Sequence, residues 1–187
     1  RTEKIMDETS QQRLGLGFDP QILRNKYIEE REKRVRSDGL AQFLRASQAF
    51  PWMVEDLFDH TAPDREALTD EIDVLIVGGG MSGLMTAGAL KKAGTKSLRI
   101  IERAADFGGV WYWNRYPGVQ CDTESYVYLP WLEEVGFMPK EKYSKGKDIA
   151  GYLRQMGRHF GLYPRTCFKT KVDRFSWDEE ASRWIVS

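Results

Sequence analysis

The stretch that decides the fold is Ile-Asp-Val-Leu-Ile-Val-Gly-Gly-Gly-Met-Ser-Gly, residues 72–83. Its first half is short, apolar and rich in β-branched residues, which is typical of a strand buried on both faces of a parallel sheet. The glycines then lead into a segment, Ser82–Ala93, that predicts a helix ended by Gly94. Residues 97–101 (SLRII) predict a second strand. The sequence therefore predicts a βαβ unit and an α/β fold.

The glycines of this unit follow the pattern GxGxxG, and each position has its own physical reason. Gly78 permits a tight turn, Gly80 lets the backbone approach a pyrophosphate, and Gly83 allows the helix to pack closely on the strand. Glu102 ends the second strand about 20 residues later, where an acid accepts hydrogen bonds from ribose hydroxyls and disfavours a 2′-phosphate. This favours FAD or NAD over NADP at the site. The alternative is a glycine turn without a ligand, with Glu102 merely solvated.

A second glycine pair, Gly108-Gly109, follows soon after Glu102 and suggests another close backbone approach to the same dinucleotide. The arrangement resembles the E-x(4–6)-G-G-x-W continuation of flavoproteins with two dinucleotide-binding domains. It favours FAD, because an NAD-dependent dehydrogenase leaves the second pair unexplained and no catalytic His, Lys or Tyr constellation follows.

Residues 108–128, GGVWYWNRYPGVQCDTESYVY, resemble the signature that follows the FAD fingerprint in Baeyer–Villiger monooxygenases. The run is richer in aromatic residues than its counterpart in the N-hydroxylating and dimethylaniline-type flavin monooxygenases. The resemblance covers roughly residues 72–187. Less specifically, the segment before Ile72 resembles the extension of the subgroup that acts on large cyclic and polycyclic ketones. One departure is Val119-Gln120, which stands where small or basic residues are common.

The resemblance implies a Rossmann-like FAD-binding domain of the two-dinucleotide-binding type over residues 72–187, incomplete, preceded by a helical extension over residues 1–71. It also implies roles for individual residues. The pyrophosphate would be held by Gly78, Gly80, Ser82 and Gly83, and the adenosine ribose by Glu102. The flavin side would be lined by Gly109, Val110, Trp111, Tyr112 and Trp113, with Asp122 and Tyr128 beside the isoalloxazine. The adenine end would meet the backbone of Val172, and the nicotinamide of NADP would lie near Gln120, Cys121 and Asp122.

Asp122 is the one catalytic candidate, with an electrostatic role opposite an arginine that this sequence does not identify. Alternatives remain open for these residues: the aromatic side chains could be core residues, and Asp122 could cap a local turn. His60 and His159 carry no catalytic signal.

The activity implied by the resemblance is an NADPH- and O₂-dependent conversion of ketones, bulky cyclic ones first, to esters or lactones on FAD. The alternatives are a heteroatom-oxygenating flavin monooxygenase and a catalytically inactive FAD-binding fragment or interaction module. The chain has no second GxGxxG and no F-x-G-x-x-x-H-type signature. We therefore expect the remaining C-terminal part of the enzyme as a partner, and expect the fragment alone to bind FAD weakly or not at all and to be inactive.

The segments around this unit give coarser predictions. In the extension, Gln21–Arg36 predicts a helix, and Thr61–Asp70 predicts a linker or short helix. An apolar group there looks able to dock on a larger body: Leu40, Phe43, Leu44, Phe50, Trp52, Met53, Leu57 and Phe58. Toward the other end, Lys147–Phe160 predicts an amphipathic helix. Cys167–Val172 and Arg183–Val186 predict strands, separated by a turn region at residues 177–180.

Composition limits the partners and the chemistry. The 187 residues include 28 basic and 28 acidic side chains, which gives no electrostatic case for nucleic acid or an anionic membrane. No apolar run approaches the length of about 18–20 residues that spans a bilayer. Cys121 and Cys167 lie far apart, which supports neither a metal site nor a redox CxxC pair and makes a disulfide an unfavoured alternative. We expect a soluble, cytoplasmic chain without a metal.

Overall fold

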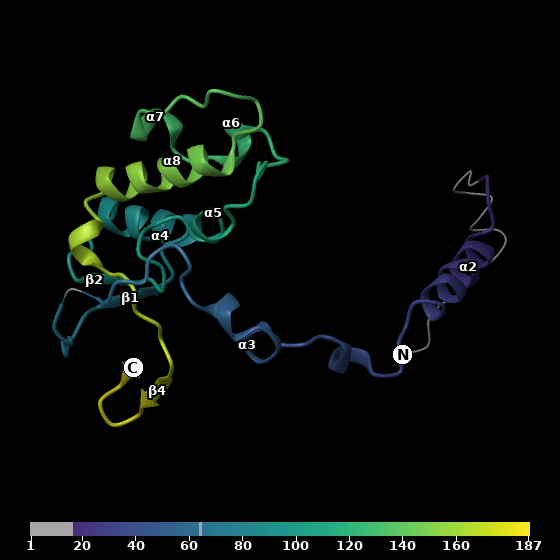
Figure 1. The fold of residues 1–187 in the computed structure, drawn as a ribbon, viewed down its shortest axis with the longest axis horizontal. Coiled ribbons are helices and arrows are strands. Elements are labelled where there is room, and N and C mark those ends of the chain that lie inside the picture. The colour runs from purple at the N-terminus through teal and green to yellow at the C-terminus, as the bar shows by residue number, and fades with distance from the viewer. Residues whose placement is uncertain (1–16, 64) are drawn as a thin grey trace. The chain divides into compact units, whose positions relative to one another are not determined.

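The computed structural model describes residues 17–63 and 65–187, and the chain divides into two compact units after Glu55 (Figure 1). From residue 17 on, the elements of the first unit are helices: α2 (Pro20–Glu32), η1 (Gly39–Gln42), α3 (Ala46–Ala49) and η2 (Pro51–Val54). The second unit, from Asp56 on, contains every strand of the described chain together with the remaining helices. Each unit is described by itself.

Helix α2 confirms the helix predicted in the extension, with a shorter span. It begins at Pro20, whose fixed φ suits the first helical position, after Asp19, whose carboxylate accepts a hydrogen bond from the Gln21 N–H at 2.7 Å. No residue of α2 is buried. Large apolar side chains are exposed in this unit, among them Leu40, Phe43, Leu44, Phe50 and Trp52. The side chain of Met53 lies outside the described ones.

The second unit is built on a parallel sheet in the order β1-β2-β3: β1 (Val74–Val77), β2 (Leu98–Ile101) and β3 (Thr166–Cys167). Val74 pairs with Leu98 and Val77 with Ile101, so β1 and β2 are in register over their full length. Helix α4 (Met81–Lys92) joins them. The predicted βαβ unit is confirmed, with both strands shorter than predicted.

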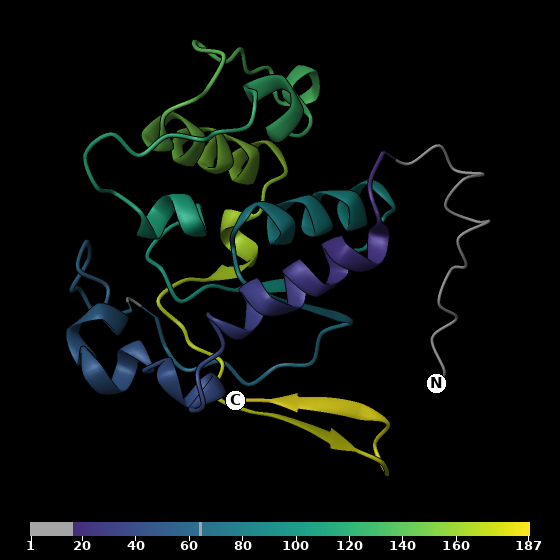
Figure 2. The ribbon, with the colours of Figure 1, turned by 90° about the vertical axis from the view of Figure 1, so that its right-hand side faces the viewer.

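Two long helices lie in layers above this sheet, α4 on the strands and α8 (Gly146–His159) on α4 (Figure 2). Leu84 and Ala87 of α4 are fully buried against the sheet residues Ile76 and Ile100. The amphipathic helix predicted at residues 147–160 is thus confirmed, and its apolar face is buried: Ile149, Ala150, Tyr152, Leu153 and Met156. Burying each large apolar side chain contributes about 1.5–3 kcal/mol, so this face holds α8 on the fold.

Three short helices lie between β2 and α8, and a 3-10 helix leads from α8 to β3. They are α5 (Val110–Trp113), α6 (Ser125–Tyr128), α7 (Leu132–Val135) and η3 (Tyr163–Arg165). An isolated antiparallel bridge between Gln120 and Lys145 ties the loop before α6 to the loop before α8.

The strand predicted at Cys167–Val172 is wrong beyond its first residue. Only Thr166 and Cys167 pair with β2, because Lys169 adopts φ +53°, a left-handed conformation that ends an extended strand. The N–H groups of Lys169 and Thr170 then bond to the carbonyls of Ala104 and Glu102 instead of continuing the ladder. Val172 therefore lies outside the strands.

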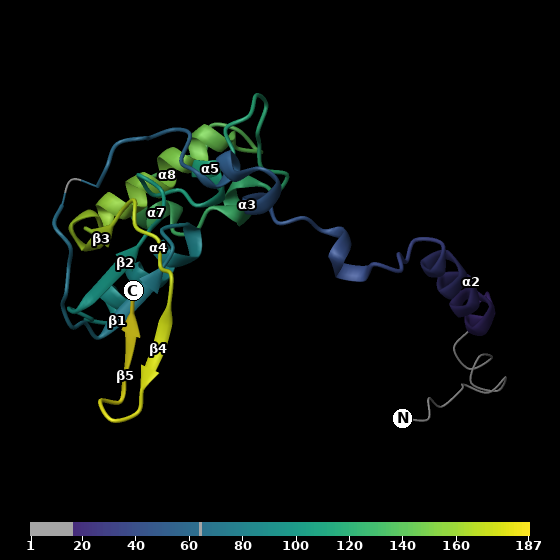
Figure 3. The ribbon, with the colours of Figure 1, turned by 60° about the horizontal axis from the view of Figure 1, so that its bottom comes forward.

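The last strand, β5 (Arg183–Val186), is confirmed, but the turn region before it is misplaced. Trp177 and Asp178 belong to β4 (Phe175–Asp178), which pairs with β5 in an antiparallel hairpin. Trp177 lies opposite Trp184, with ring centroids 5.4 Å apart, and this cross-strand aromatic pair favours the strand over the turn. Figure 3 shows the hairpin leading away from the parallel sheet.

Among the described residues, no helix is both long and apolar enough to cross a membrane. Cys121 and Cys167 are buried free thiols. The described part of residues 61–70 contains no helix, and its assignment as a linker stays a prediction.

Candidate cofactor-binding site

The glycine loop between β1 and α4 has the geometry that its sequence predicts. Gly78 adopts φ +103° and donates its N–H to the Ile101 carbonyl at 2.8 Å, so the turn is joined to the end of β2. A Cβ on Gly83 would lie 2.0 Å from the Gly78 carbonyl oxygen, far inside van der Waals contact. Only glycine at position 83 allows the first turn of α4 to sit directly on the end of β1.

The second glycine pair meets the first at the backbone. Gly108 donates its N–H to the Gly79 carbonyl at 3.2 Å, and a Cβ on Gly109 would lie 2.8 Å from the Gly80 Cα. Gly109 has φ +54° and ψ −126°, which side-chain-bearing residues rarely adopt. Helix α4 begins after Gly80 without a side-chain cap, which leaves the N–H groups of its first turn available to an anion.

Glu102 lies buried beneath both loops, with 5% of its surface exposed. Its Oε2 accepts the Gly79 N–H at 2.5 Å and its Oε1 accepts the Ala104 N–H at 2.6 Å. Each carboxylate oxygen can accept a second hydrogen bond, so Glu102 fits a ribose while it holds the loop. The alternative in which Glu102 is merely solvated does not hold, because its side chain is buried.

The aromatic run after Gly109 forms the short helix α5, and its side chains diverge. Val110 is 61% exposed, whereas Tyr112 is buried. Trp111 is half-buried and donates its Nε1–H to the Tyr128 hydroxyl at 2.9 Å, and Trp113 stacks with the Arg103 guanidinium at 4.5 Å.

Tyr112 is the aromatic residue of this run that is tied most firmly to the protein. Its hydroxyl donates to Asp56 Oδ2 at 2.7 Å. Burial, together with the hydrogen bond to the Asp56 carboxylate, raises the pKa of Tyr112 to about 12. Tyr112 therefore stays a neutral hydrogen-bond donor throughout the physiological pH range. Its contacts favour the alternative of a core aromatic residue over direct contact with the flavin ring.

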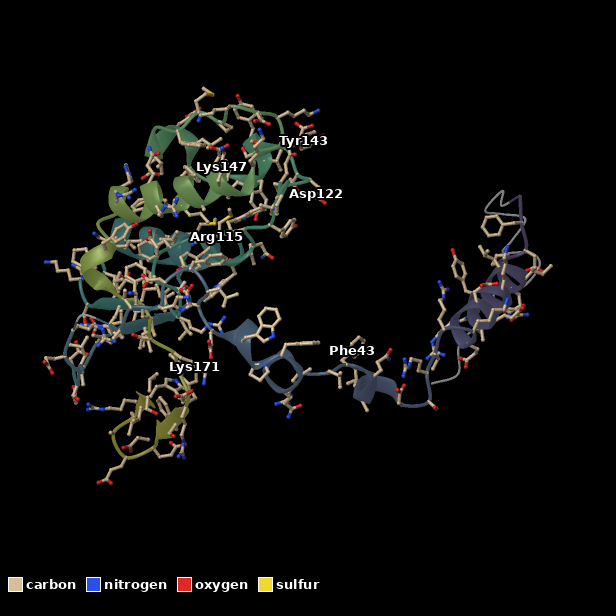
Figure 4. All side chains as sticks on the ribbon, viewed as in Figure 1. Phe43, Arg115, Asp122, Tyr143, Lys147 and Lys171 are labelled. Carbon is tan, nitrogen blue, oxygen red and sulfur yellow. The ribbon has the colours of Figure 1, made fainter. Side chains whose placement is uncertain are left out.

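The loop that carries Gln120, Cys121 and Asp122 is held by the loop before α8. Gln120 donates its Nε2–H to the Tyr143 carbonyl at 2.6 Å, and Cys121 donates its N–H to the Ser144 carbonyl at 3.0 Å. Asp122 is exposed, and none of the ion pairs found in residues 17–63 and 65–187 includes it. Figure 4 shows Asp122 and Tyr143 at the same edge of the second unit.

The described contacts thus join five of the predicted residues into one group. Gly78, Gly80, Gly83, Glu102 and Gly109 meet at the carboxyl ends of β1 and β2. Ser82 is exposed on the first turn of α4. The roles of Asp122 and Val172 stay predictions.

Three residues of this region were not predicted. The backbone N–H groups of Gly79 and Ala104 hold Glu102, and Asp56 holds Tyr112. For Gly79 the sequence signal was its place in the glycine run at residues 78–80. The structure gives the reason for glycine there, because a Cβ would lie 2.8 Å from Phe107 Cδ1. No sequence signal pointed to Asp56.

Comparisons with known proteins show which families this chain is similar to. Residues 76–135 match the family of NAD(P)-binding Rossmann-like domains. Over 172 residues, 91% of this chain, the sequence is 45% identical to a Baeyer–Villiger monooxygenase of Stachybotrys chlorohalonatus, of which the match covers 28%. The chain is homologous to Baeyer–Villiger monooxygenases. The resemblance inferred from residues 108–128 is confirmed.

Solved structures of such monooxygenases agree. The polycyclic ketone monooxygenase of Thermothelomyces thermophila superposes with a TM-score of 0.79 at 35% identity, over 89% of this chain and 28% of that one. OTEMO, solved in complex with FAD and NADP, superposes with a TM-score of 0.57 at 27% identity, over 68% of this chain and 23% of that one. The predicted Rossmann-like fold is therefore confirmed. The chain spans about 28% of the length of the curated Baeyer–Villiger monooxygenase that it matches.

Proposed function

We propose that this chain is the FAD-binding segment of a Baeyer–Villiger monooxygenase that uses NADPH and O₂ to convert bulky cyclic ketones to esters or lactones. The observation that carries the proposal is the backbone contact between Gly80 and Gly109. One glycine loop is sufficient for a dinucleotide turn, whereas two glycine loops in contact at the N-terminus of α4 fit a cofactor that continues beyond the first βαβ unit.

The residues present fit FAD in chemistry as well as in shape. The N–H groups at the start of α4 would bind the pyrophosphate, since Gly80 leaves them uncapped and the helix dipole favours negative charge. Glu102 would accept hydrogen bonds from the adenosine ribose with the lone pairs that Gly79 and Ala104 leave free. A bound FAD would supply the redox and oxygen chemistry, and this chain would bind and orient it.

The aromatic residues of this segment would shape the flavin side. Val110 is exposed next to the Gly109 turn, and Trp111 is held at a fixed angle by its hydrogen bond to Tyr128. These two residues, with Trp113, are the ones we propose beside the ring. Tyr112 would contribute by holding the turn, because its hydroxyl is already bonded to Asp56.

Asp122 is proposed as the acid near the flavin and the nicotinamide, with Gln120 and Cys121 beside it. Its carboxylate is exposed, so it is accessible to an arginine from the part of the enzyme that this chain does not include. Its proposed role is electrostatic, and Val172 is proposed at the adenine end.

The names of two relatives support the proposed substrate class. One relative is named a polycyclic ketone monooxygenase, and another, 44% identical, is named neopentalenolactone D synthase. We propose a bulky cyclic ketone and O₂ as substrates and the cytoplasm as the location, with neither nucleic acid nor membrane as partner. The balance of 28 basic and 28 acidic residues supports the last point.

The test is product analysis with the full-length protein, NADPH and a panel of bulky cyclic ketones, amines and sulfides. The expected product is a lactone from at least one ketone. Formation of N-oxides or sulfoxides with no lactone from any ketone would instead support the heteroatom-oxygenating alternative. Asp122→Ala is expected to keep FAD bound while lactone formation falls; unchanged lactone formation would remove Asp122 from the site.

A further inference from the structure

A polar segment outside the predicted site contacts α5, the short helix that follows the second glycine pair. The strap, defined as residues 56–63 and 65–71, contains no helix or strand, yet its side chains bond along the second unit. At its start, Asp56 reaches α5. We propose that Asp56 positions the second glycine loop for the cofactor by fastening both ends of residues 105–112, an inference that rests on the proposed function.

The Asp56 carboxylate is linked to both sides of the glycine pair through the Tyr112 hydroxyl. Downstream of the pair, Tyr112 donates its hydroxyl to Asp56 Oδ2 at 2.7 Å. Upstream, the Ala105 N–H donates to the same Tyr112 hydroxyl at 3.4 Å, so it is linked to the carboxylate through Tyr112. Gly108 and Gly109 lie between Ala105 and Tyr112, so the hydroxyl that Asp56 holds closes the loop that carries them.

The closure reaches the glycines directly. Tyr112 donates its N–H to the Gly109 carbonyl at 2.9 Å, and a Cβ on Gly108 would lie 3.0 Å from the Tyr112 Cβ. A shift of Tyr112 would therefore move Gly109, which touches Gly80. The glycine pair itself has no side chain with which to pack, although Phe107 before it is fully buried.

A second contact from the strap holds the same helix. The Phe58 ring packs edge-on against Tyr112 with centroids 6.0 Å apart, and Arg115 lies over both rings, 3.9 Å from Phe58 and 4.4 Å from Tyr112. The Arg115 Nε donates to the Tyr112 carbonyl at 2.8 Å. Figure 4 labels Arg115 in the second unit.

Further along, the strap is anchored to elements away from the glycine loop. Lys169 lies 3.0 Å from Asp59, Arg65 donates to Thr170 at 2.6 Å, and Asp70 pairs with Arg99 at 2.5 Å. These anchors hold the strap in place without contacting residues 105–112. The chain thus offers a matched pair: Asp56, which bears on the loop, and Asp59, which only fastens the strap.

The ionisation of Asp56 is consistent with this geometry. Burial alone would raise its pKa, but hydrogen bonds from Tyr112 and from backbone N–H groups, that of Phe58 first, outweigh it and lower the pKa. Asp56 is therefore an anion at neutral pH, and a charge-assisted bond to Tyr112 is stronger than a neutral one.

The experiment measures FAD affinity and loop protection in full-length apoprotein carrying Asp56→Ala, Asp56→Asn, Tyr112→Phe, the double change Asp56→Ala/Tyr112→Phe, or the control Asp59→Ala. Titration with FAD gives the dissociation constant, and hydrogen exchange of the peptide spanning residues 105–112 reports the loop without cofactor. Losing a hydrogen bond to a charged group predicts about a tenfold weaker FAD affinity for Asp56→Ala and for Tyr112→Phe. The double variant should bind FAD no more weakly than either single variant, because both single changes remove the same hydrogen bond.

Asp56→Asn keeps one acceptor and should recover much of the affinity, and Asp59→Ala should match the wild type in both readouts. Equal FAD affinity and equal loop exchange in Asp56→Ala and Asp59→Ala would overturn the proposal, as would additive losses in the double variant. If the wild-type protein binds no FAD at all, the proposed function fails. The exchange measurement still decides in that case whether Asp56 orders the loop.

Discussion

Gly109→Ala perturbs the contact on which the proposed cofactor site depends. A methyl group there would lie 2.8 Å from the Gly80 Cα, and the backbone at φ +54° and ψ −126° is one that alanine rarely adopts. The backbone strain costs about 1–3 kcal/mol. The forced separation of two packed backbones adds about 1–3 kcal/mol.

Gly118→Ala is the matched control, because Gly118 also has a positive φ, +82°, but no atom within 4 Å of an added Cβ. It carries the strain without the clash. Gly109→Ala should therefore destabilise the junction by about 1–3 kcal/mol more than Gly118→Ala. A difference of this size should also weaken FAD binding, because Gly80 moves with Gly109.

Hydrogen exchange of peptides spanning residues 78–84 and 105–113 in the full-length protein measures the opening of this junction locally. Gly109→Ala should lower protection in both peptides, since Gly108 bonds to the Gly79 carbonyl and Leu84 to the Gly80 carbonyl. Equal protection in the two variants would refute the reasoning. It would show that the two glycine loops are not in contact in the protein.

Three further predictions follow from the site. Gly83→Ala places a methyl group 2.0 Å from the Gly78 carbonyl oxygen, so the purified variant should lose its FAD and its helical circular dichroism on mild heating; a wild-type melting curve would contradict this. Glu102→Gln leaves one amide N–H facing a backbone N–H, because both carboxylate oxygens are acceptors, and should cost about 1–3 kcal/mol in thermal unfolding; an unchanged midpoint would argue against the two bonds. The free energy of unfolding should also fall as the pH rises from 10 toward 12, because burial raises the pKa of three tyrosines to about 12, whereas tyrosines of the unfolded chain ionise near pH 10. Tyrosine absorbance measures the ionisation. If all tyrosines ionised together near pH 10, the prediction would be wrong. The three tyrosines with a raised pKa are Tyr112, Tyr152 and Tyr163.

The βαβ unit could be predicted from the sequence because its signals are local. A β-branched run, a glycine turn and a helix follow one another directly, and Glu102 ends the next strand. The second glycine pair could also be connected to the first, because glycine at consecutive positions has few uses other than an unusual turn or a close approach.

Other parts could not be predicted because they depend on contacts between residues far apart in the chain. Cys167–Val172 has the composition of a strand, but Lys169 turns away to bond with Ala104, which no local pattern reveals. Asp56 reads as one more acid in a charged segment. Its hydrogen bond to Tyr112 spans 56 positions and leaves no periodic signal.

Aromatic side chains are a third case, because their identity does not tell where they point. Trp111, Tyr112 and Trp113 are consecutive on one short helix, so their directions necessarily differ. The structure buries Tyr112 and leaves its neighbours partly accessible. Sequence reasoning could name the run and could not divide it between core and cofactor.

The visible absorption spectrum of the full-length protein tests the central claim most directly. The purified protein, incubated with FAD and freed of unbound cofactor, should be yellow and show the flavin absorption bands, and Gly109→Ala should reduce the retained flavin. A colourless wild-type protein after the same treatment would contradict the assignment of the Gly80–Gly109 junction as an FAD site.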